Sequence, residues 1–323
     1  MDSRPIYPII AGPTASGKSD LAIQVAKAMG GEVVSADSMQ IYDTVHIGTA
    51  RPLISEMQEV PHHLLGFLPL NEKYSVARYM EDASAVFADV LSRGRLPVMC
   101  GGTGLYIQSF MENRQLLEQA DNAELRARLL QRAESESGQV LLEELAAIDA
   151  ATASRLHPND VHRIVRALEV YYSTGRTMAQ QEELSHACPS PYVGCLIVLN
   201  FRDRDVLYRR IEQRVDRMLD SGLLEEARTV LMQSKDATVL QAIGYKELLP
   251  YLEGKISLEQ AVQDLKIQTR HYAKRQLSWF RRMTAAATLY VDEYEDHAAL
   301  TQAAISAYND FVRRLRDGNN EER

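Results

Sequence analysis

The sequence lacks the features that a membrane protein, a secreted protein or a zinc protein would need. No apolar run approaches the ~20 residues of a membrane-spanning helix. The N-terminus lacks the basic region, apolar core and small-residue cleavage site of a signal peptide. The three cysteines, at positions 100, 188 and 195, include no C-x-x-C pair. An odd count without zinc spacing predicts reduced, buried thiols, so we expect a cytoplasmic protein that has no membrane partner.

Basic residues are also in short supply. Lys and Arg together number 36 against 44 Asp and Glu, so the net charge is −8. A nucleic-acid binder is usually basic, and any such function must therefore come from a local patch. The chain is 46% hydrophobic and 25% charged, which predicts an ordinary core. Its 323 residues suffice for one large domain or two modest ones.

Residues 12–19 read GPTASGKS and fit the phosphate-loop pattern G-x-x-x-x-G-K-[ST]. A strand-like apolar run precedes the loop at 6–11 and a helix-like pattern follows it, which is the context that the motif requires. The backbone N–H groups of such a loop form a nest for anions. Lys18 can neutralise phosphate charge and Ser19 can ligate Mg²⁺. The predicted phosphate-binding residues are Gly12, Pro13, Thr14, Ala15, Ser16, Gly17, Lys18 and Ser19.

Strand and helix signals alternate over the first ~110 residues, as a parallel α/β sheet requires. The expected strands are 6–11, 32–36, 96–100 and 192–201, and a helix is expected at 76–92. Ligands in open α/β sheets lie beyond the carboxyl ends of the strands. The phosphate loop, Asp37 and the glycine turn at 101–104 follow three of these strands, so we expect them to converge.

The segment 115–187 is rich in Ala, Leu, Glu and Arg and has no clear strand signal. We interpret it as a helical insert, with its last strong helix within 157–175. Helices alone are expected after residue 201. The predicted fold is thus an α/β P-loop NTPase-like parallel-sheet core, residues 1–114 and 188–316, with C-terminal helices and the helical insert.

Asp37 and the histidine pair at 62–63 each have two interpretations. By its position, Asp37 resembles an aspartate that holds Mg²⁺ through water, and we favour this role over that of a general base. The adjacent His62 and His63 point apart on an extended chain and have no third ligand at suitable spacing, so we expect structural or hydrogen-bonding roles for them.

The phosphate loop alone also suits ATP binding by a small-molecule or nucleoside kinase. Such a kinase would use an arginine-rich lid, and the stretch RDRDVLYRRIEQR at 202–214 could supply one. The guanine-reading motif N-K-x-D is absent, which argues against a GTPase. From these residues alone, the kinase remains the alternative.

One stretch departs from the acidic composition. Residues 266–282 contain six Lys and Arg and no acid. Lys266, Arg270 and Lys274 recur every four residues, so a helix would carry them as a basic stripe on one face. A solvated amphipathic helix is the alternative, but the one-sided charge favours a phosphate backbone as its partner.

Aromatic residues are interleaved in the same stretch, namely Tyr272, Trp279 and Phe280. Aromatic rings can stack on unpaired bases, but we expect these three to belong to the core. Arg163 and Arg166, three residues apart on the predicted helix in the insert, form a smaller basic patch.

Eight strings together resemble the bacterial type of the tRNA dimethylallyltransferases, also called tRNA isopentenyltransferases. They run in the family's order from residue 12 to 281 and read GPTASGKS, SADSMQIY, IGTARP, PHHL, GGTGLY, HPNDVHRIVRALEVYYSTG, IGYKE and TRHYAKRQLSWFR. The resemblance implies a P-loop core with a helical insertion domain and a prenyltransferase activity in tRNA modification. Members transfer a dimethylallyl group from dimethylallyl diphosphate to N6 of the adenosine 3′ of the anticodon, in tRNAs reading codons that begin with U. The product is N6-isopentenyladenosine.

The resemblance also implies roles for single residues. The loop would hold the diphosphate, with Thr14 and Ser19 nearest to it and Arg210 in contact with it. Asp37 would be the base for N6, which reverses the preference from position alone. The implied catalytic residues are Thr14, Lys18, Asp37 and Arg210.

The target adenine has to leave its stack to reach such a site, so base flipping is implied. Ser38, Met39 and Gln40 would flank it. Thr103, Arg126, residues 162–166 and residues 241–246 match tRNA-contacting positions of the family. With the basic helix added, the predicted tRNA-binding residues are Asp37, Ser38, Met39, Gln40, Thr103, Arg126, His162, Arg163, Arg166, Gly244, Lys246, Arg270, Lys274 and Arg275.

The sequence departs from the family pattern at three places. Arg51 stands where IGTAKP has lysine, and Gly66 stands where an aspartate commonly follows HHL-x. The C-terminal zinc finger of eukaryotic members has no counterpart, because no cysteine follows Arg282 and the only later histidine is His297. We expect a monomer that binds tRNA and dimethylallyl diphosphate and uses Mg²⁺.

Overall fold

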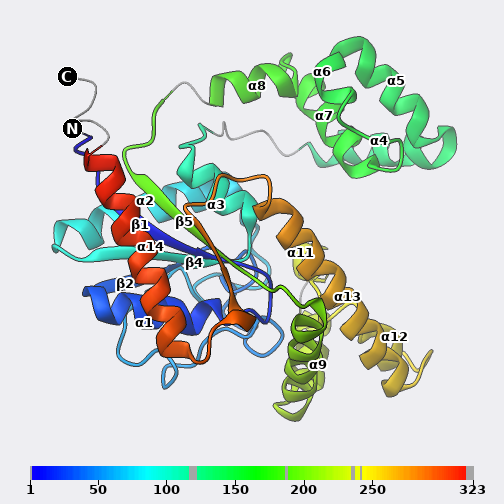
Figure 1. Ribbon diagram of the computed structural model, residues 1–323. Helices are drawn as coiled ribbons and strands as arrows, with labels where there is room; N and C mark the ends of the chain where they lie inside the picture. Colours follow the sequence, from blue (N-terminus) through cyan, green and yellow to red (C-terminus); the bar gives the residue numbers. More distant parts are fainter. Residues whose placement is uncertain (1, 116–121, 186–187, 234–236, 241, 318–323) are drawn as a thin grey trace. The chain divides into compact units, whose positions relative to one another are not determined.

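The computed structural model describes residues 2–115, 122–185, 188–233, 237–240 and 242–317. The chain divides into two compact units. One consists of Met1–Met111 and Pro191–Arg323, and the other of Glu112–Ser190. Figure 1 shows the first unit built around a twisted sheet and the second built from helices.

A parallel sheet forms the centre of the first unit (Figure 1). Its strands within the described residues are β1 (Ile6–Ala11), β2 (Gly31–Ser35), β3 (His62–His63), β4 (Leu96–Gly101), β5 (Val193–Asn200) and β6 (Ala287–Tyr290). Their order is β3-β2-β4-β1-β5-β6, and each neighbouring pair is parallel. The predicted parallel α/β core is therefore confirmed. All carboxyl ends lie at one edge of the sheet, which is where such folds bind ligands.

Strand β1 is central, so both of its faces are buried. Tyr7 points to one face and meets Phe87 and Phe110, with ring centroids 4.7 and 5.9 Å away. Ile10 points to the other face and packs in one cluster with Leu21. The first face is covered by α2 (Val76–Ser92) and α3 (Gly104–Met111), and the second by α1 (Lys18–Met29) and α14 (His297–Asp317).

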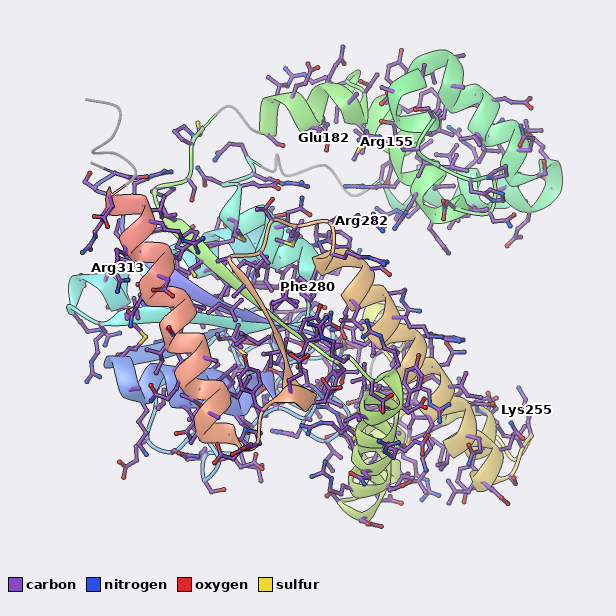
Figure 2. The ribbon with its side chains drawn as sticks, in the orientation of Figure 1. Arg155, Glu182, Lys255, Phe280, Arg282 and Arg313 are labelled. Carbon is purple, nitrogen blue, oxygen red and sulfur yellow. The ribbon has the colours of Figure 1, made fainter. Side chains whose placement is uncertain are left out.

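A layer of helices stands beside the sheet and contributes to the site. It comprises α9 (Arg204–Asp220), α10 (Leu223–Gln233), α11 (Ala237–Leu240), α12 (Leu249–Leu252) and α13 (Leu258–Phe280). Helix α13 begins after Ser257, whose side chain accepts the N–H of Gln260. At its other end Phe280 is buried, whereas Arg282 lies at the surface (Figure 2).

The expectation of helices alone after residue 201 is wrong at residues 287–290. These residues form β6, which extends the sheet through pairs such as Leu289 with Leu199. A short 3₁₀ helix, Val291–Glu293, follows it. Four residues after an alanine-rich stretch are too few for a clear period, and pairing with β5 supplies the stability that the local sequence does not.

Within its described residues, the second unit contains helices and their connecting turns but no strand. Its helices are α4 (Ala123–Glu136), α5 (Gly138–Ile148), α6 (Ala150–Ala153), α7 (Val161–Thr174) and α8 (Met178–Ser185). Helix α7 lies within the stretch predicted for it and ends at Gly175, which adopts φ of 71°. Leu141 and Leu168 are fully buried in the core of this unit. Arg155 and Glu182 pair on its surface at 3.2 Å (Figure 2).

All three cysteines are free thiols. Cys100 and Cys195 are buried as predicted, but Cys188 is exposed, so the expectation of three buried thiols is wrong at that position. Among the described residues, no helix is both long enough and apolar enough to cross a membrane.

Candidate active site

The phosphate loop connects the carboxyl end of β1 to the first turn of α1. Gly17 caps α1 with φ of 84°, a left-handed conformation that glycine adopts without strain. Gly12 lies close to β5, since a Cβ there would stand 3.0 Å from the Cβ of Leu199. The Ser16 hydroxyl is buried and has no hydrogen-bond partner within the described residues. A bound phosphate oxygen would give that group its missing partner.

Lys18 is the cation of this loop. Its Nζ donates to the Pro13 carbonyl at 3.3 Å, and it forms no ion pair among the described residues. Burial lowers the pKa of the Lys18 ammonium, and the nearby Cys100 and Asp37 act in the opposite direction. Its charge is thus directed into the site and not neutralised by a neighbouring carboxylate.

Helix α9 brings two more cations to the loop. Arg210 Nε donates to the Ala15 carbonyl at 2.9 Å, which fits its expected place beside a bound diphosphate. Arg214, one turn later, donates to the Thr49 carbonyl at 3.4 Å. Burial lowers the pKa of both guanidinium groups. Sequence reasoning missed Arg214, although its spacing of four from Arg210 on a helix was a usable signal.

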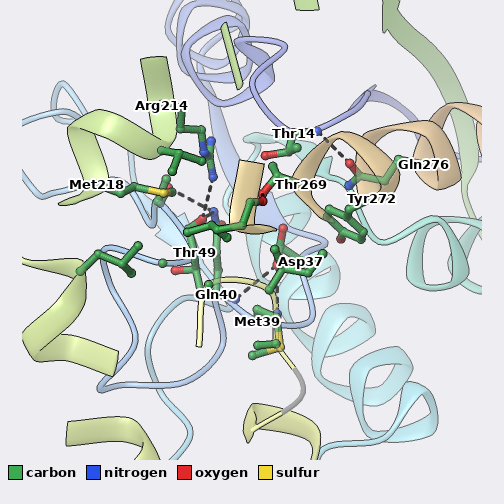
Figure 3. Close-up of a pocket in the computed structure, with 18 of the residues that line it drawn as sticks. Thr14, Asp37, Met39, Gln40, Thr49, Arg214, Met218, Thr269, Tyr272 and Gln276 are labelled. Carbon is green, nitrogen blue, oxygen red and sulfur yellow. Dashed lines mark hydrogen bonds between the residues drawn. The ribbon is translucent and has the colours of Figure 1, made fainter. Parts of the chain in front are cut away.

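Asp37 follows β2 and lies at the same edge of the sheet (Figure 3). Its Oδ1 accepts the N–H groups of Met39 at 2.9 Å and Gln40 at 3.3 Å. Within the described part of the chain, Oδ2 accepts no hydrogen bond. The side chain is therefore anchored through one oxygen, while the other oxygen is available to a ligand in the cavity that Asp37 lines.

The glycine turn after β4 joins the other two motifs. The Thr103 hydroxyl accepts the Ser38 N–H at 2.9 Å. Gln276 of α13 donates to the Gly102 carbonyl at 3.0 Å and accepts the Thr14 N–H at 2.8 Å (Figure 3). The phosphate loop, the Asp37 segment and the turn thus converge, as the sheet topology predicts. Gln276 was missed, although it lies in the recognised string TRHYAKRQLSWFR.

These groups surround a cavity of about 310 Å³. Its polar lining includes the predicted residues Thr14, Lys18, Ser19, Asp37, Ser38, Gln40, Lys246 and Arg275, beside the predicted Met39 and Gly244. It also includes residues that sequence reasoning did not find, namely Thr49, Arg214, Thr269 and Gln276, and Tyr272, which was expected in the core. Burial raises the pKa of Tyr272, so its phenol is a neutral hydrogen-bonding group. A second cavity of about 390 Å³ shares Lys18, Ser19 and Arg214 with the first.

The basic stripe on α13 is largely neutralised. Lys266 pairs with Asp216 of α9 at 2.6 Å, and Arg270 pairs with Glu212 of the same helix. The expectation of a continuous stripe of free charge is therefore wrong for these two residues, because they face α9. Lys274 is exposed and forms no ion pair among the described residues.

The aromatic residues of α13 divide between core and cavity. Phe280 is buried, as expected, and Trp279 packs so closely on Gly104 that any Cβ there would overlap its ring. Tyr272 instead is half-buried and lines the cavity, so the expectation of a core role is wrong for this residue.

In the helical unit, two predicted tRNA-binding arginines share one carboxylate. Glu169 is 1% exposed and pairs with Arg126 at 2.8 Å and with Arg166 at 3.0 Å. His162 and Arg163 are exposed on the same helix, α7. Of the matched string at 241–246, Gln241 lies outside the described residues, whereas Gly244 and Lys246 line the cavity.

Two of the departures from the family pattern, Arg51 and Gly66, meet in space. Gly66 adopts φ of 57°, and any side chain there would overlap the guanidinium of Arg51. That guanidinium donates to the carbonyls of Tyr42 at 2.8 Å and Asp43 at 3.1 Å. The missing side chain at position 66 therefore makes room for the larger cation at position 51.

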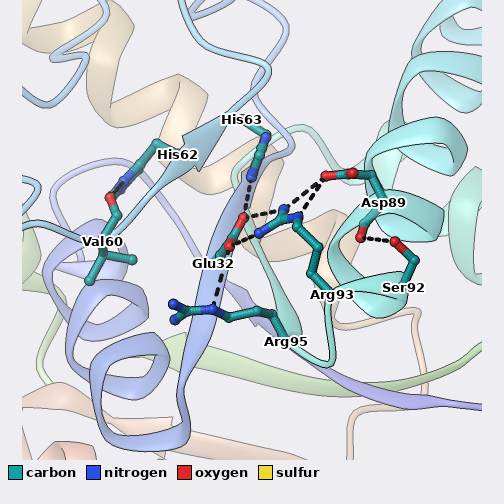
Figure 4. A network of polar contacts seen from close by, with 8 residues as sticks. All are labelled: Glu32, Val60, His62, His63, Asp89, Ser92, Arg93 and Arg95. Carbon is teal, nitrogen blue, oxygen red and sulfur yellow. Dashed lines mark hydrogen bonds and ion pairs between the residues drawn. The ribbon is translucent and has the colours of Figure 1, made fainter.

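The adjacent histidines have structural roles, as expected. His63 Nε2 lies 2.7 Å from the buried Glu32 carboxylate, and His62 Nδ1 lies 2.8 Å from the Val60 carbonyl (Figure 4). Arg93 completes the network with two hydrogen bonds to Glu32. Among the described residues, no cluster of three or more His, Cys, Asp or Glu could hold a metal ion.

Family models and relatives of known function match this chain over most of its length. A family model described as IPP transferase matches residues 40–283, and one described as isopentenyl transferase matches residues 5–72. The chain belongs to the IPP transferase family. The tRNA dimethylallyltransferase of Thermoanaerobacter sp. (strain X514) is 43% identical over 300 residues, covering 92% of this chain and 95% of that relative.

Solved structures of the same family share the fold. The full-length tRNA isopentenylpyrophosphate transferase of Bacillus halodurans aligns with a TM-score of 0.71 and 36% identity, covering 99% of both chains. A eukaryotic dimethylallyltransferase, described as acting on tRNA, aligns with a TM-score of 0.78 and 29% identity. That alignment covers 96% of this chain and 80% of the eukaryotic one.

Proposed function

We propose that the protein transfers a dimethylallyl group from dimethylallyl diphosphate to N6 of the adenosine 3′ of the anticodon, in tRNAs reading codons that begin with U. The observation that carries this proposal is one cavity with a phosphate loop, an anchored carboxylate and an apolar wall. The similarity to tRNA dimethylallyltransferases supports the same activity and argues against the kinase alternative.

The cavity suits both ends of the donor. The loop N–H groups, Lys18, Arg210 and Arg214 would hold the diphosphate. The dimethylallyl group needs an apolar surface, and the apolar part of the cavity lining offers one. The apolar lining residues are Val215, Met218, Leu223, Ala242, Ile243 and Leu265.

The same site fits a magnesium ion. Mg²⁺ prefers oxygen ligands and usually binds one or two protein groups together with substrate phosphates and water. Ser19 and Asp37 present a hydroxyl and a carboxylate to the cavity. A bound ion would add positive charge where the diphosphate leaves. We propose that Ser19 holds it, since Asp37 is needed as the base.

In the reaction, N6 of the flipped adenine forms a bond to C1 of the dimethylallyl group while the allylic C–O bond breaks. Asp37 Oδ2 takes the N6 proton, since an exocyclic amine conjugated with the ring is a weak nucleophile. The electrons of the broken bond remain on the diphosphate. Lys18, Arg210 and the loop N–H groups stabilise that charge with donors that are already in place.

We further propose that the tRNA contacts exposed cations of each unit, namely Lys274 and Arg275 on α13 and Arg163 on α7. The half-buried Lys246, which lines the cavity and pairs with Glu247 at 3.7 Å, would add to them. These residues supply the local basic surface that an acidic protein needs for binding RNA. The adenine would enter between Gln40 and Gly244, which line the cavity. A tRNA substrate also fits a cytoplasmic location.

The decisive test is nucleoside mass spectrometry of tRNA after incubation with dimethylallyl diphosphate and Mg²⁺. The wild type should form N6-isopentenyladenosine. Asp37→Asn should lower kcat by about 10²–10⁴-fold with little change in either KM, because asparagine cannot take the proton. Asp43→Asn, at an exposed position in the same segment, is the matched control. Phosphorylation of a nucleoside by ATP, without any prenylated tRNA, would refute the proposal.

A further inference from the structure

We propose that Glu226 is a positioning residue that holds residues 46–50, of which Gly48, Thr49 and Ala50 line the cavity. The inference rests on the proposed function for its catalytic consequence, whereas the contacts that carry it are independent of the reaction. Glu226 lies in the first turn of α10, far from the phosphate loop in sequence and absent from the lining of the cavity.

The carboxylate of Glu226 accepts three successive backbone N–H groups. Oε2 accepts those of His46 and Ile47, both at 2.8 Å, and Oε1 accepts that of Gly48 at 2.8 Å. The Tyr245 hydroxyl donates to Oε1 at 2.9 Å. Four donors thus occupy about as many sites as a carboxylate offers. Charge-assisted bonds of this kind are stronger than neutral ones.

The arrangement of these N–H groups requires an acceptor with two oxygens and a negative charge, which the Glu226 carboxylate provides. Three consecutive N–H groups that point at one centre form an anion nest, here filled by a side chain of the protein itself. A glutamine would turn an NH₂ donor toward one of these N–H donors. Tyr245, which is fully buried, packs so closely on Gly48 that a Cβ would stand 2.8 Å from its hydroxyl oxygen.

The held segment connects directly to catalytic groups. The Thr49 carbonyl accepts Arg214 Nη2 at 3.4 Å and Gln40 Nε2 at 3.2 Å. The Ala50 carbonyl accepts the same Gln40 amide at 3.3 Å. The Gln40 N–H in turn donates to Asp37 Oδ1 at 3.3 Å. Glu226 therefore controls, through one short segment, the places of a diphosphate cation and of the proposed base.

The test compares Glu226→Gln with Glu225→Gln, an exposed neighbour on the same helix whose carboxylate pairs with Arg228 at 2.9 Å. Loss of a charge-assisted bond predicts a rise of about tenfold or more in KM for dimethylallyl diphosphate in Glu226→Gln. The Kd for inorganic diphosphate with Mg²⁺ should rise in parallel. The control should stay within about twofold for both quantities.

A merely structural role predicts a different result. A destabilised but correctly arranged enzyme would show an unchanged KM and Kd well below its Tm, with kcat reduced only by the unfolded fraction. That outcome would overturn the proposal. If Glu226→Gln does not fold, Tyr245→Phe removes one of the four bonds and should shift KM and Kd in the same direction by a smaller factor. No shift in that variant would equally overturn it.

The diphosphate Kd separates this inference from the proposed function. If the wild type forms no prenylated adenosine but Glu226→Gln still weakens diphosphate binding, the function is wrong and the positioning role stands. If the wild type prenylates tRNA and neither KM nor Kd changes in Glu226→Gln, the function stands and the positioning role is wrong.

Discussion

Replacing Gln276 with leucine should destabilise the protein and loosen its phosphate loop. The Gln276 side chain is buried and forms two hydrogen bonds, one from the Thr14 N–H at 2.8 Å and one to the Gly102 carbonyl at 3.0 Å. Leucine has a similar volume, so the packing of α13 against the loop should survive. Both backbone groups would then be buried without a partner.

The size of the effect follows from these two groups. Each buried backbone group left without a partner costs about 1–3 kcal/mol, so the pair costs about 2–6 kcal/mol. Burying an apolar side chain in place of an amide offsets about 1–2 kcal/mol. We therefore expect the free energy of unfolding to fall by about 2.5 kcal/mol, the difference between the midpoints of these two ranges.

Urea unfolding at constant pH, in a buffer without diphosphate, phosphate or Mg²⁺, measures this change. Gln263→Leu, at an exposed position on the same helix, is the control and should stay within about 0.5 kcal/mol of the wild type. If Gln276→Leu also stays within that range, the two bonds do not join the loop to the turn as the structure indicates. The same variant should raise the Kd for inorganic diphosphate, because the Thr14 N–H is no longer held.

Three further changes have defined outcomes. Hydrogen bonds from Arg93 hold the pKa of Glu32 at about 2, below the ordinary 4.5. The ionised Glu32 therefore stabilises the folded protein above pH 4.5, and this contribution is lost as the pH falls toward 2. Glu32→Gln should remove that part of the pH dependence of urea unfolding. Lys274→Gln should weaken tRNA binding and reduce its salt slope by about one unit, whereas the paired Lys266→Gln should leave the slope unchanged. Gly104→Ala should lower the Tm by forcing a Cβ into the ring of Trp279, at a cost of about 1–3 kcal/mol.

Each of these has a contrary result. An acid unfolding curve that is the same with and without the Glu32 carboxylate would mean that its pairing adds no net stability. Equal salt slopes for the two lysine variants would mean that α13 does not touch the tRNA backbone through Lys274. An unchanged Tm in Gly104→Ala would mean that the contact between α3 and α13 is loose.

Local sequence signals were sufficient to predict the parts of the protein that depend on neighbouring residues. The strand at 6–11 and the helix at 76–92 have the predicted bounds, because a run of apolar residues and a period of 3.6 are local signals. The phosphate loop is also local, since its strand, turn and helix are continuous in the chain. The order of the recognised strings was sufficient to place the chain in its family, which the comparisons confirm.

Contacts between residues that are far apart in the chain could not be predicted in this way and depend on how the elements pack. Gln276 reaches Thr14 over 262 positions, and Glu226 reaches His46 over 180. Strand β6 exists because β5 pairs with it, and Lys266 lost its free charge because α9 presents an acid to it. A residue's type and spacing state which bonds it can form, but its actual partner depends on which element the fold packs against it.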